Sequence, residues 1–322
     1  MRWVALFALA AAALVGGVAL GPADMSWSES LAGLLGKGDE TAVVIVRELR
    51  APRVLLAFLV GGSLAVTGAA LQALVRNPLA DPYLLGLSGG AGVGAVLAIA
   101  LHLGGAWAVP VAAFVGALVA IGLVYRLALV AGAGIDPRVL LLAGVVVSAF
   151  GGAILGAIFS LSSAAELRNA MLWLLGGFDA ASWRVVAMFT SYAAIPVAYL
   201  YYTSRPLDLL SLGEDPAQFL GVDVERLKRR LYVAASLLTA ACVAVSGIIG
   251  FVGLVIPHAV RMVLGHTHRT LLPAAFLLGG TLLAAADAVA RTAFAPRELP
   301  VGVVTSLVGV PVFAMLLRRW TR

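Results

Sequence analysis

Long apolar runs, each about as long as a lipid bilayer is thick, are separated along this sequence by short clusters of charged residues. The hydrocarbon core of a bilayer is ~30 Å thick, and a helix needs roughly 20 apolar residues to cross it. Of the 322 residues 62% are hydrophobic and only 12% are charged, which is too little charge to cover a soluble domain of this length. Because lipid offers the backbone no hydrogen-bond partners, each crossing segment must be helical. The sequence therefore predicts an all-α polytopic membrane protein, with one transmembrane domain over residues 1–322.

Ten apolar runs are candidate membrane spans. The first run has the residue pattern of a signal peptide as well as that of a first membrane span. It is long for the apolar part of a signal peptide and further spans follow, which favours an uncleaved helix. The runs are Val4–Leu20, Val54–Val75, Tyr83–Leu103, Ala106–Leu129, Val139–Leu161, Val185–Tyr202, Leu231–Ser246, Phe251–Leu264, Leu271–Val289 and Val301–Leu317.

Basic residues set the predicted topology, because the cytoplasmic flanks of membrane spans are rich in Lys and Arg. The run from Leu231 to Leu264 has basic flanks at both ends, so we expect it to cross twice, with a turn near Gly247–Gly253. About ten crossings then leave both termini in the cytoplasm and most of the 22 basic residues on the inner side. The net charge of +6 is explained in the same way, rather than by nucleic-acid binding. The basic residues left on the outer side are Lys37, Arg47, Arg50, Arg53, Arg168, Arg184, Arg291 and Arg297.

A weak internal repeat accompanies this topology. Leu64–Gly86 aligns without gaps on Val243–Gly265, with Thr67 opposite Ser246. The first copy starts in a run that leads inward, and the second starts in a run that leads outward. Inverted repeats of this kind are common in transporters. The alignment therefore predicts an inverted internal repeat.

Small residues recur in the fifth and tenth runs. Residues four apart lie close to one face of a helix. Such a face allows a neighbouring helix to pack closely, or it forms a smooth wall beside a conduit, and a subunit interface would permit both. In the fifth run these residues are Gly144, Ser148, Gly152 and Gly156. In the tenth run they are Gly302, Thr305, Ser306 and Gly309.

The longest polar connection lies between the sixth and seventh runs. Within it, residues 212–221 are predicted to form a short helix, with Asp215 as its N-cap, Pro216 at its first position and Gly221 closing it. Phe219 and Leu220 would then be apolar side chains at the cytoplasmic surface, which favours a docking element over a simple connecting turn. The segment consists of Leu212, Gly213, Glu214, Asp215, Pro216, Ala217, Gln218, Phe219, Leu220 and Gly221.

No residue pattern in the sequence indicates a catalytic, metal or cofactor site. The glycine-rich stretch 86–94 lacks the Lys-Ser/Thr ending of a phosphate loop, and close helix packing explains it better. The histidines have no carboxylate or cysteine companions at metal-binding spacing. Asp287 and Arg291 are four residues apart and are predicted to form an ion pair at membrane depth. We therefore expect no enzymatic activity, bound metal or cofactor in this chain.

Several segments together resemble the permease family that imports iron–siderophore complexes, haem and vitamin B12. They occur in order over nearly the whole chain, from Arg47 to Leu317. The resemblance implies a type II ABC importer, in which a homodimer of a ten-span permease works with two cytoplasmic ATPase subunits and an external solute-binding protein. The segments are RNPLADPYLLGLSGGAGVG, LLLAGV, LWLLGGF, SLGEDPAQFLGV, GFVGLVIPHAVR, HRTLLPAAFLLGG and ELPVGVVTSLVGVPVF.

The resemblance also implies roles for matching residues. Residues 212–221 match the segment that docks into a cleft of the ATPase, and the fifth and tenth runs match the helices that line the central pathway at the dimer axis. Arg168 and Trp173 match a short outer helix after the fifth run. Arg50, Arg53 and Arg291 match basic residues that meet acidic residues of the binding protein.

Docking of an acidic partner would account for all three of these outer arginines. A structural role accounts for Arg291, through Asp287, but less readily for Arg50 and Arg53, which have only Glu48 close in sequence.

The expected function is ATP-driven import of a ferric siderophore, haem or vitamin B12 across the bacterial inner membrane into the cytoplasm. ATP and Mg²⁺ would be bound by the partner ATPase, and the sequence does not choose among the cargos. The alternative is an ion- or proton-coupled secondary transporter, which needs carboxylates within its spans. Asp287 is the only such carboxylate. The expected partners are a second copy of the chain, two ATPase subunits, a solute-binding protein and the lipid bilayer, without nucleic acid.

Overall fold

The structure is a computed structural model that describes residues 1–23, 25–131 and 135–320, the last five of these by backbone alone. Within these ranges the regular structure is helical and no strand occurs. The prediction of an all-α fold is thus confirmed. The elements are α1 Arg2–Ala19, α2 Trp27–Leu34, α3 Glu40–Val44, η1 Ile45–Arg50, α4 Ala51–Val75, η2 Pro82–Leu85, α5 Leu87–Ala100, α6 Ala108–Val130, α7 Pro137–Leu161, α8 Ala164–Leu174, α9 Trp183–Tyr202, α10 Ser204–Leu212, α11 Glu214–Phe219, α12 Val224–Ser246, α13 Val252–Leu264, α14 His268–Thr292 and α15 Val301–Trp320.

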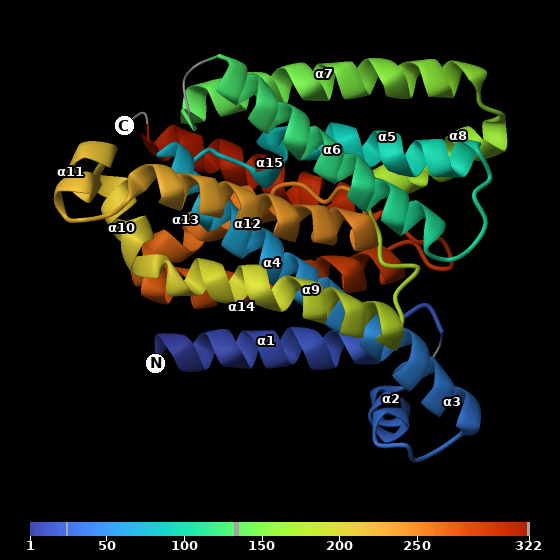
Figure 1. Cartoon of the computed structure of the whole chain (residues 1–322). Coiled ribbons are helices and arrows are strands. Elements are labelled where there is room, and N and C mark those ends of the chain that lie inside the picture. Colours follow the sequence, from blue (N-terminus) through green and yellow to red (C-terminus); the bar gives the residue numbers. More distant parts are fainter. Residues whose placement is uncertain (24, 132–134, 321–322) are drawn as a thin grey trace.

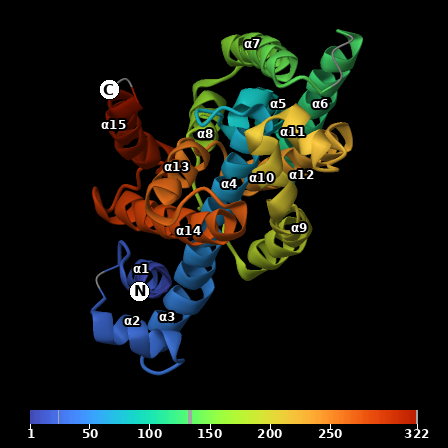
Figure 2. The same cartoon turned by 90° about the vertical axis from the view of Figure 1, so that its left-hand side faces the viewer.

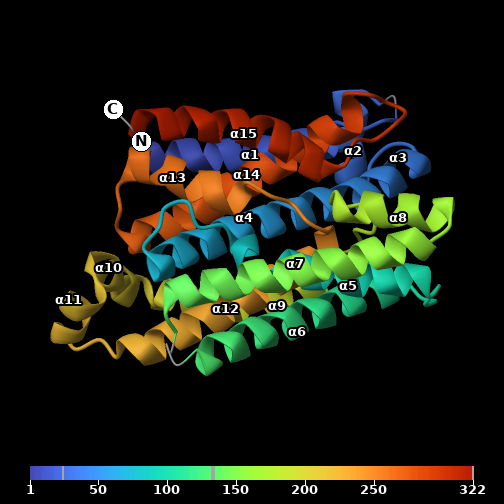
Figure 3. The same ribbon diagram turned by 90° about the horizontal axis from the view of Figure 1, so that it is seen from above.

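The long helices run roughly side by side in an elongated bundle (Figure 1, Figure 3). α10 and α11 lie at one end of the bundle, where α1 also begins and α14 starts. We call this the α11 end. The short helices α2, α3 and α8 lie at the opposite end, which we call the α8 end. The two ends therefore carry the polar connections, and the apolar helices lie between them.

Helix α4 runs through the middle of the bundle and packs against α14, α12, α13 and α9 (Figure 2). Most of its residues are buried, including the glycines that allow close helix crossings. A Cβ atom added at Gly61 would lie 2.3 Å from the carbonyl oxygen of Gly279 in α14, so neither glycine can carry a side chain without moving the helices apart. Small residues at such crossings are the usual means of helix packing in membranes.

The ten predicted spans coincide in order with α1, α4, α5, α6, α7, α9, α12, α13, α14 and α15. Seven of these helices are long and apolar enough to cross a membrane, and α5, α13 and the apolar part of α15 are shorter. The 13 residues of α13 rise only about 20 Å. The predicted turn near Gly247–Gly253 is present as a non-helical segment between α12 and α13. The polytopic fold is confirmed, and the count of ten complete crossings stays a prediction.

The gapless alignment behind the predicted inverted repeat does not match the local structures. Residues 64–75 belong to α4, whereas the aligned residues 243–254 include the non-helical turn after Ser246. Conversely, the loop after Arg76 aligns with the middle of α13. The two segments instead pack against each other, since a Cβ atom at Gly68 would overlap the carbonyl group of Gly253. The gapless alignment therefore does not pair structurally equivalent residues. No residue pairing in the described structure supports an inverted repeat.

Helix α8 confirms the predicted short helix after the fifth run. It begins with a capping box, in which the Ser163 side chain accepts from the backbone N–H of Glu166 and the Glu166 carboxylate accepts from the backbone N–H of Ser163. These hydrogen bonds lower the pKa of Glu166 below its ordinary value. Arg168 in this helix is exposed. The α8 end thus presents a well-defined polar surface.

Candidate functional site

Helix α11 forms a compact projection at the α11 end of the bundle (Figure 1). It is bracketed by Gly213, with φ +131°, and Gly221, with φ +85°. Both backbone conformations favour glycine. The prediction that Gly221 closes the helix is therefore confirmed. The predicted N-terminus is wrong, because the helix begins at Glu214 after Gly213, which places Asp215 and Pro216 inside its first turn.

The exposed side of α11 is apolar. The Phe219 side chain is 92% exposed and Leu220 is 63% exposed, while Ala217 is fully buried against the bundle. A large aromatic side chain that contacts nothing on its own chain is costly in water and indicates an interaction surface when it lies among other apolar residues. Leu212, at the end of α10, adds a third exposed apolar side chain. This surface has the character of a docking element rather than of a simple turn.

An ion-pair cluster fixes α11 to the next long helix. The ammonium group of Lys228 in α12 lies 2.9 Å from the carboxylate of Glu214 and also pairs with Glu225. The Lys228 side chain is almost fully buried, so it reaches the carboxylates from beneath. The Lys228–Glu214 ion pair therefore connects α11 to α12 in addition to the loop between them.

Arg50, at the α8 end, is buried and satisfied by its own chain. Its guanidinium group donates to the carbonyl oxygens of Ala19 (3.0 Å) and Ala23 (3.2 Å) and to the hydroxyl of Ser30 (3.4 Å). These groups belong to the end of α1, the following loop and α2. Arg50 therefore holds the first helix and the α2 segment against the start of α4.

Asp287 in α14 joins the other two predicted docking arginines. It is fully buried, and its carboxylate accepts from Arg53 at 3.0 Å and from Arg291 at 2.9 Å. The ion pair predicted between Asp287 and Arg291 is therefore confirmed. Arg291 also donates to the carbonyl oxygens of Gly17 and Leu20 at the end of α1.

Arg53 has two further carboxylate partners nearer the surface. It pairs with Glu298 at 2.8 Å and with Asp179 at 3.2 Å, and its side chain is 13% exposed. The expectation that a structural role would less readily account for Arg50 and Arg53 is wrong, because both are held by partners distant in sequence. Arg50 and Arg291 are interior side chains that do not lie on an open surface. Other basic side chains at this end are exposed, namely Arg47, Arg168, Arg184 and Arg297.

The small residues of α7 do not share one environment. A Cβ atom on Gly144 would lie 2.1 Å from the carbonyl oxygen of Leu84, whereas no atom of another described element lies within 4 Å of a Cβ atom on Gly152 or Gly156. The reason is geometric, because a step of four residues advances 400° around a helix and drifts about 40° each time. Gly144 therefore serves packing within the chain, and Gly152 and Gly156 face away from it. Ser148 is partly buried, between the packed Gly144 and the open Gly152, and its backbone lies near Gly89.

The corresponding residues of α15 are mostly turned inward. A Cβ atom on Gly302 would lie 2.2 Å from the carbonyl oxygen of Leu175, and one on Gly309 would lie 2.5 Å from Phe251. Thr305 is buried and bonds to the carbonyl oxygen of Gly302. Ser306 is only partly buried. Within one chain, this group is chiefly a packing stripe.

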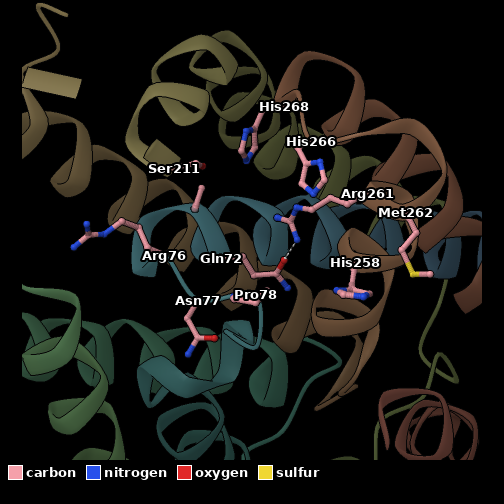
Figure 4. Close-up of a pocket in the computed structure, with 11 residues that line it drawn as sticks. Gln72, Arg76, Asn77, Pro78, Ser211, His258, Arg261, Met262, His266 and His268 are labelled. Atoms are coloured by element: carbon pink, nitrogen blue, oxygen red, sulfur yellow. Dashed lines mark hydrogen bonds between the residues drawn. The ribbon is translucent and has the colours of Figure 1, made fainter. Parts of the chain in front are cut away.

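A pocket at the α11 end was not expected from the sequence. It brings together Gln72 of α4, Arg261 of α13 and His268 of α14 (Figure 4). Gln72 and His268 are almost 200 positions apart, so no local pattern in the sequence indicates that they meet. The available signal was Arg261, a charge at the end of an apolar run with no acidic residue close to it in sequence. Among the described residues, no group of three or more His, Cys, Asp or Glu side chains is placed to hold a metal ion.

Comparison with known proteins identifies relatives over nearly the whole chain. Residues 8–319 match the FecCD transport family. The chain is 47% identical over 279 residues to the cobalamin import system permease protein BtuC of Halobacterium salinarum, which covers 87% of this chain and 74% of the relative. It is 44% identical over 277 residues to the hemin transport system permease protein HmuU of Yersinia pestis, covering 84% of this chain and 82% of the relative.

A third relative and a solved structure agree with these matches. The ABC transporter permease protein YvrB of Bacillus subtilis, itself uncharacterized, is 42% identical over 300 residues, covering 92% of this chain and 85% of the relative. A solved structure described as an inward-facing metal-chelate type ABC transporter superposes with a TM-score of 0.85 at 29% identity, covering 98% of this chain and 97% of that one.

Proposed function

Because the chain belongs to the FecCD transport family, we propose that it is the membrane permease subunit of an ATP-driven importer for vitamin B12, haem or a related metal chelate. The observation that carries the proposal is the apolar docking surface of α11, Leu212, Phe219 and Leu220, on a chain similar to importer permeases throughout its length. The α11 end would then face the cytoplasm of a bacterium, and both termini would lie there.

The proposed complex contains two copies of this chain, two ATPase subunits and one external solute-binding protein. ATP and Mg²⁺ would bind to the ATPases, so this chain would not itself be an enzyme. Each ATPase would receive α11 in a cleft and move it on closure. The buried Lys228 cluster supports this role, since it links α11 rigidly to a membrane helix.

The open face of α7 is proposed to meet the second copy around the translocation pathway. Gly152 and Gly156 face away from their own chain, and the neighbouring side chains of Val145 and Phe150 are exposed. Ser148 and, from α15, Ser306 would add polar groups near this face. Gly144, Gly302, Thr305 and Gly309 would support the pathway from behind, by close packing.

The solute-binding protein is proposed to dock on the α8 end, where exposed basic side chains gather. Of the three arginines matched by resemblance, Arg53 alone is partly exposed, and an acidic partner could reach it by replacing Asp179 or Glu298. Arg50 and Arg291 would support this surface from within. Exposed charges of this kind chiefly set association rate and salt response.

The alternative of an ion- or proton-coupled transporter has little support. Such a carrier needs an intramembrane carboxylate that gains and loses a proton. Asp287 is instead held by two arginines, with Arg53 on one carboxylate oxygen and Arg291 on the other.

The test is reconstitution of the chain in proteoliposomes with its ATPase and binding protein. Labelled vitamin B12, haem and a ferric siderophore would each be offered in separate vesicles, with and without ATP. We expect ATP-dependent uptake of one of these classes, and capture of the same compound by the binding protein alone. Uptake that follows an ion gradient and ignores ATP would contradict the proposal.

Two leucine substitutions in α7 separate pathway from packing. Gly152→Leu is expected to lower uptake severely while the melting temperature of the purified chain stays within a few degrees, because no described atom of a neighbouring helix lies within 4 Å of a Cβ atom at this position. Gly144→Leu is the control, and should destabilise the fold by about 1–3 kcal/mol or more, since it overpacks the Leu84 backbone. Unchanged uptake by Gly152→Leu would remove this face from the pathway and the dimer contact.

A further inference from the structure

A pocket of about 510 Å³ opens at the α11 end of the bundle, between the end of α4, α10, α13 and the start of α14. Figure 4 shows the side chains around it, with Arg261 and His268 directed toward the same space. Its volume lies within the roughly 300–1,000 Å³ of small-molecule sites. The lining residues are Gln72, Ala73, Arg76, Asn77, Pro78, Ser211, His258, Arg261, Met262, His266 and His268.

The charge of this lining is positive. Arg261 donates to the amide oxygen of Gln72, a neutral group, and no Asp or Glu oxygen among the described residues lies within 4.0 Å of its guanidinium group. Arg76 has only a long contact of 3.8 Å with Glu214. The Glu214 carboxylate is already engaged by Lys228 at 2.9 Å. The Arg261 guanidinium group therefore faces the pocket without a carboxylate of its own, whereas the Arg76 side chain lines the rim and is directed away from Arg261 and His268 (Figure 4).

His268 supplies a second and independent indication of a ligand. Its Nδ1 atom lies 2.6 Å from the carboxylate of Asp208, which also accepts from the His268 backbone N–H at 2.8 Å. These two contacts fix the ring. The Nε2 atom is buried and has no hydrogen-bond partner in the part of the chain that the structure describes, on a residue that is 3% exposed. Buried polar atoms are rarely left unpaired, and each such case calls for a partner that is not in the chain.

We propose that this pocket binds a phosphate group, as the free anion or as the headgroup of an anionic phospholipid. The guanidinium group of Arg261 presents parallel N–H donors that match phosphate oxygens. Because Nδ1 of His268 donates to Asp208, the ring would carry a second proton on Nε2 in the complex and would donate it to a phosphate oxygen at the same site. Basic pockets between membrane helices near the bilayer surface bind phospholipid headgroups for this reason. Asp208 pairs with Nδ1 of the His268 ring and keeps that ring oriented.

The experiment measures binding to the purified full-length chain in a detergent that contains no phosphate. One arm uses radiolabelled inorganic phosphate in equilibrium dialysis. A second arm uses dioctanoyl phosphatidylglycerol, with dioctanoylglycerol as the phosphate-free lipid, and counts bound molecules by native mass spectrometry. Binding in the first arm alone identifies the free anion as the ligand, and binding in the second alone identifies the lipid headgroup. Binding in neither arm would overturn the proposal.

Arg261→Gln tests the site directly and should weaken binding at least about tenfold, because charge-assisted hydrogen bonds are lost. Arg261→Lys keeps the positive charge but lacks the parallel N–H donors of the guanidinium group, and it should retain part of the affinity. Arg269→Gln is the matched control, since Arg269 is exposed, removes the same charge and does not line the pocket. Thermal unfolding confirms that each variant is folded. Equal binding by Arg261→Gln and Arg269→Gln would show that the pocket is not the binding site.

Discussion

Replacing Asp287 with asparagine is expected to destabilise the chain by about 3–5 kcal/mol, because it leaves buried arginines without their shared carboxylate. The substitution keeps the shape of the side chain and removes only its charge. Arg53 and Arg291 lie 3.0 and 2.9 Å from the carboxylate, and Asp287 is fully buried. The measurement is SDS-induced unfolding of the purified chain in mixed micelles, followed by circular dichroism.

Glu298→Gln is the matched control for this prediction. Glu298 also pairs with Arg53, at 2.8 Å, but its side chain is one-third exposed. Exposed ion pairs contribute at most about 1 kcal/mol, so the control should unfold within that margin of the unsubstituted chain. If Asp287→Asn were as stable as Glu298→Gln, the buried cluster would not be the structural element that its geometry indicates.

The result also bears on why arginines lie at the α8 end, which the proposed topology places away from the cytoplasm, against the general preference for basic residues on the cytoplasmic side. Arg291 donates to carbonyl oxygens at the end of α1, and Arg50 does the same from η1. The last carbonyl groups of a helix have no partners within it. These two arginines therefore donate hydrogen bonds to the last carbonyl groups of α1. These hydrogen bonds, which no apolar side chain can form, offset the free-energy cost of basic residues at this end of the bundle.

The fold could be predicted from the sequence because membrane burial leaves a simple signal. Ten apolar runs coincide with ten helices, and even the non-helical turn after Ser246 follows from basic residues at both ends of one long run. Gly221 was predictable for a similar reason, since a glycine after a short capped segment commonly closes a helix. In these cases the determining physics is local to a few neighbouring residues.

The environment of individual side chains could not be predicted in the same way. Glu48 is the only acid close to Arg53 in sequence, whereas its real partners are Asp179, Asp287 and Glu298. The spacing of Gly144 and Gly152 is uniform, yet one is packed and the other is open. Both facts depend on which distant helix lies opposite, and a single sequence does not contain that information.

Phe219→Asp is expected to abolish coupling between this chain and the proposed ATPase partner. The Phe219 ring is almost fully exposed on α11, so the substitution removes no contact inside the chain. Aromatic residues at the centre of an interface often contribute 2 kcal/mol or more to binding, which corresponds to roughly 30-fold weaker association. A charge placed in an apolar cleft adds a desolvation cost. Copurification of the ATPase and ATP-dependent uptake should therefore fall together, while the melting temperature of the isolated chain is unchanged.

Two controls make this result specific to α11. Phe219→Leu retains an apolar side chain and should preserve most of the ATPase binding. Phe294→Asp makes the same chemical change at another exposed phenylalanine, beyond the end of α14, and should leave ATPase binding intact. Lys228 of α12 pairs with α11 beneath the exposed face. Coupling between the ATPase and α12 would therefore need both the apolar contact at Phe219 and this ion pair. Persistent ATPase binding and uptake in Phe219→Asp would mean that another surface at this end receives the ATPase.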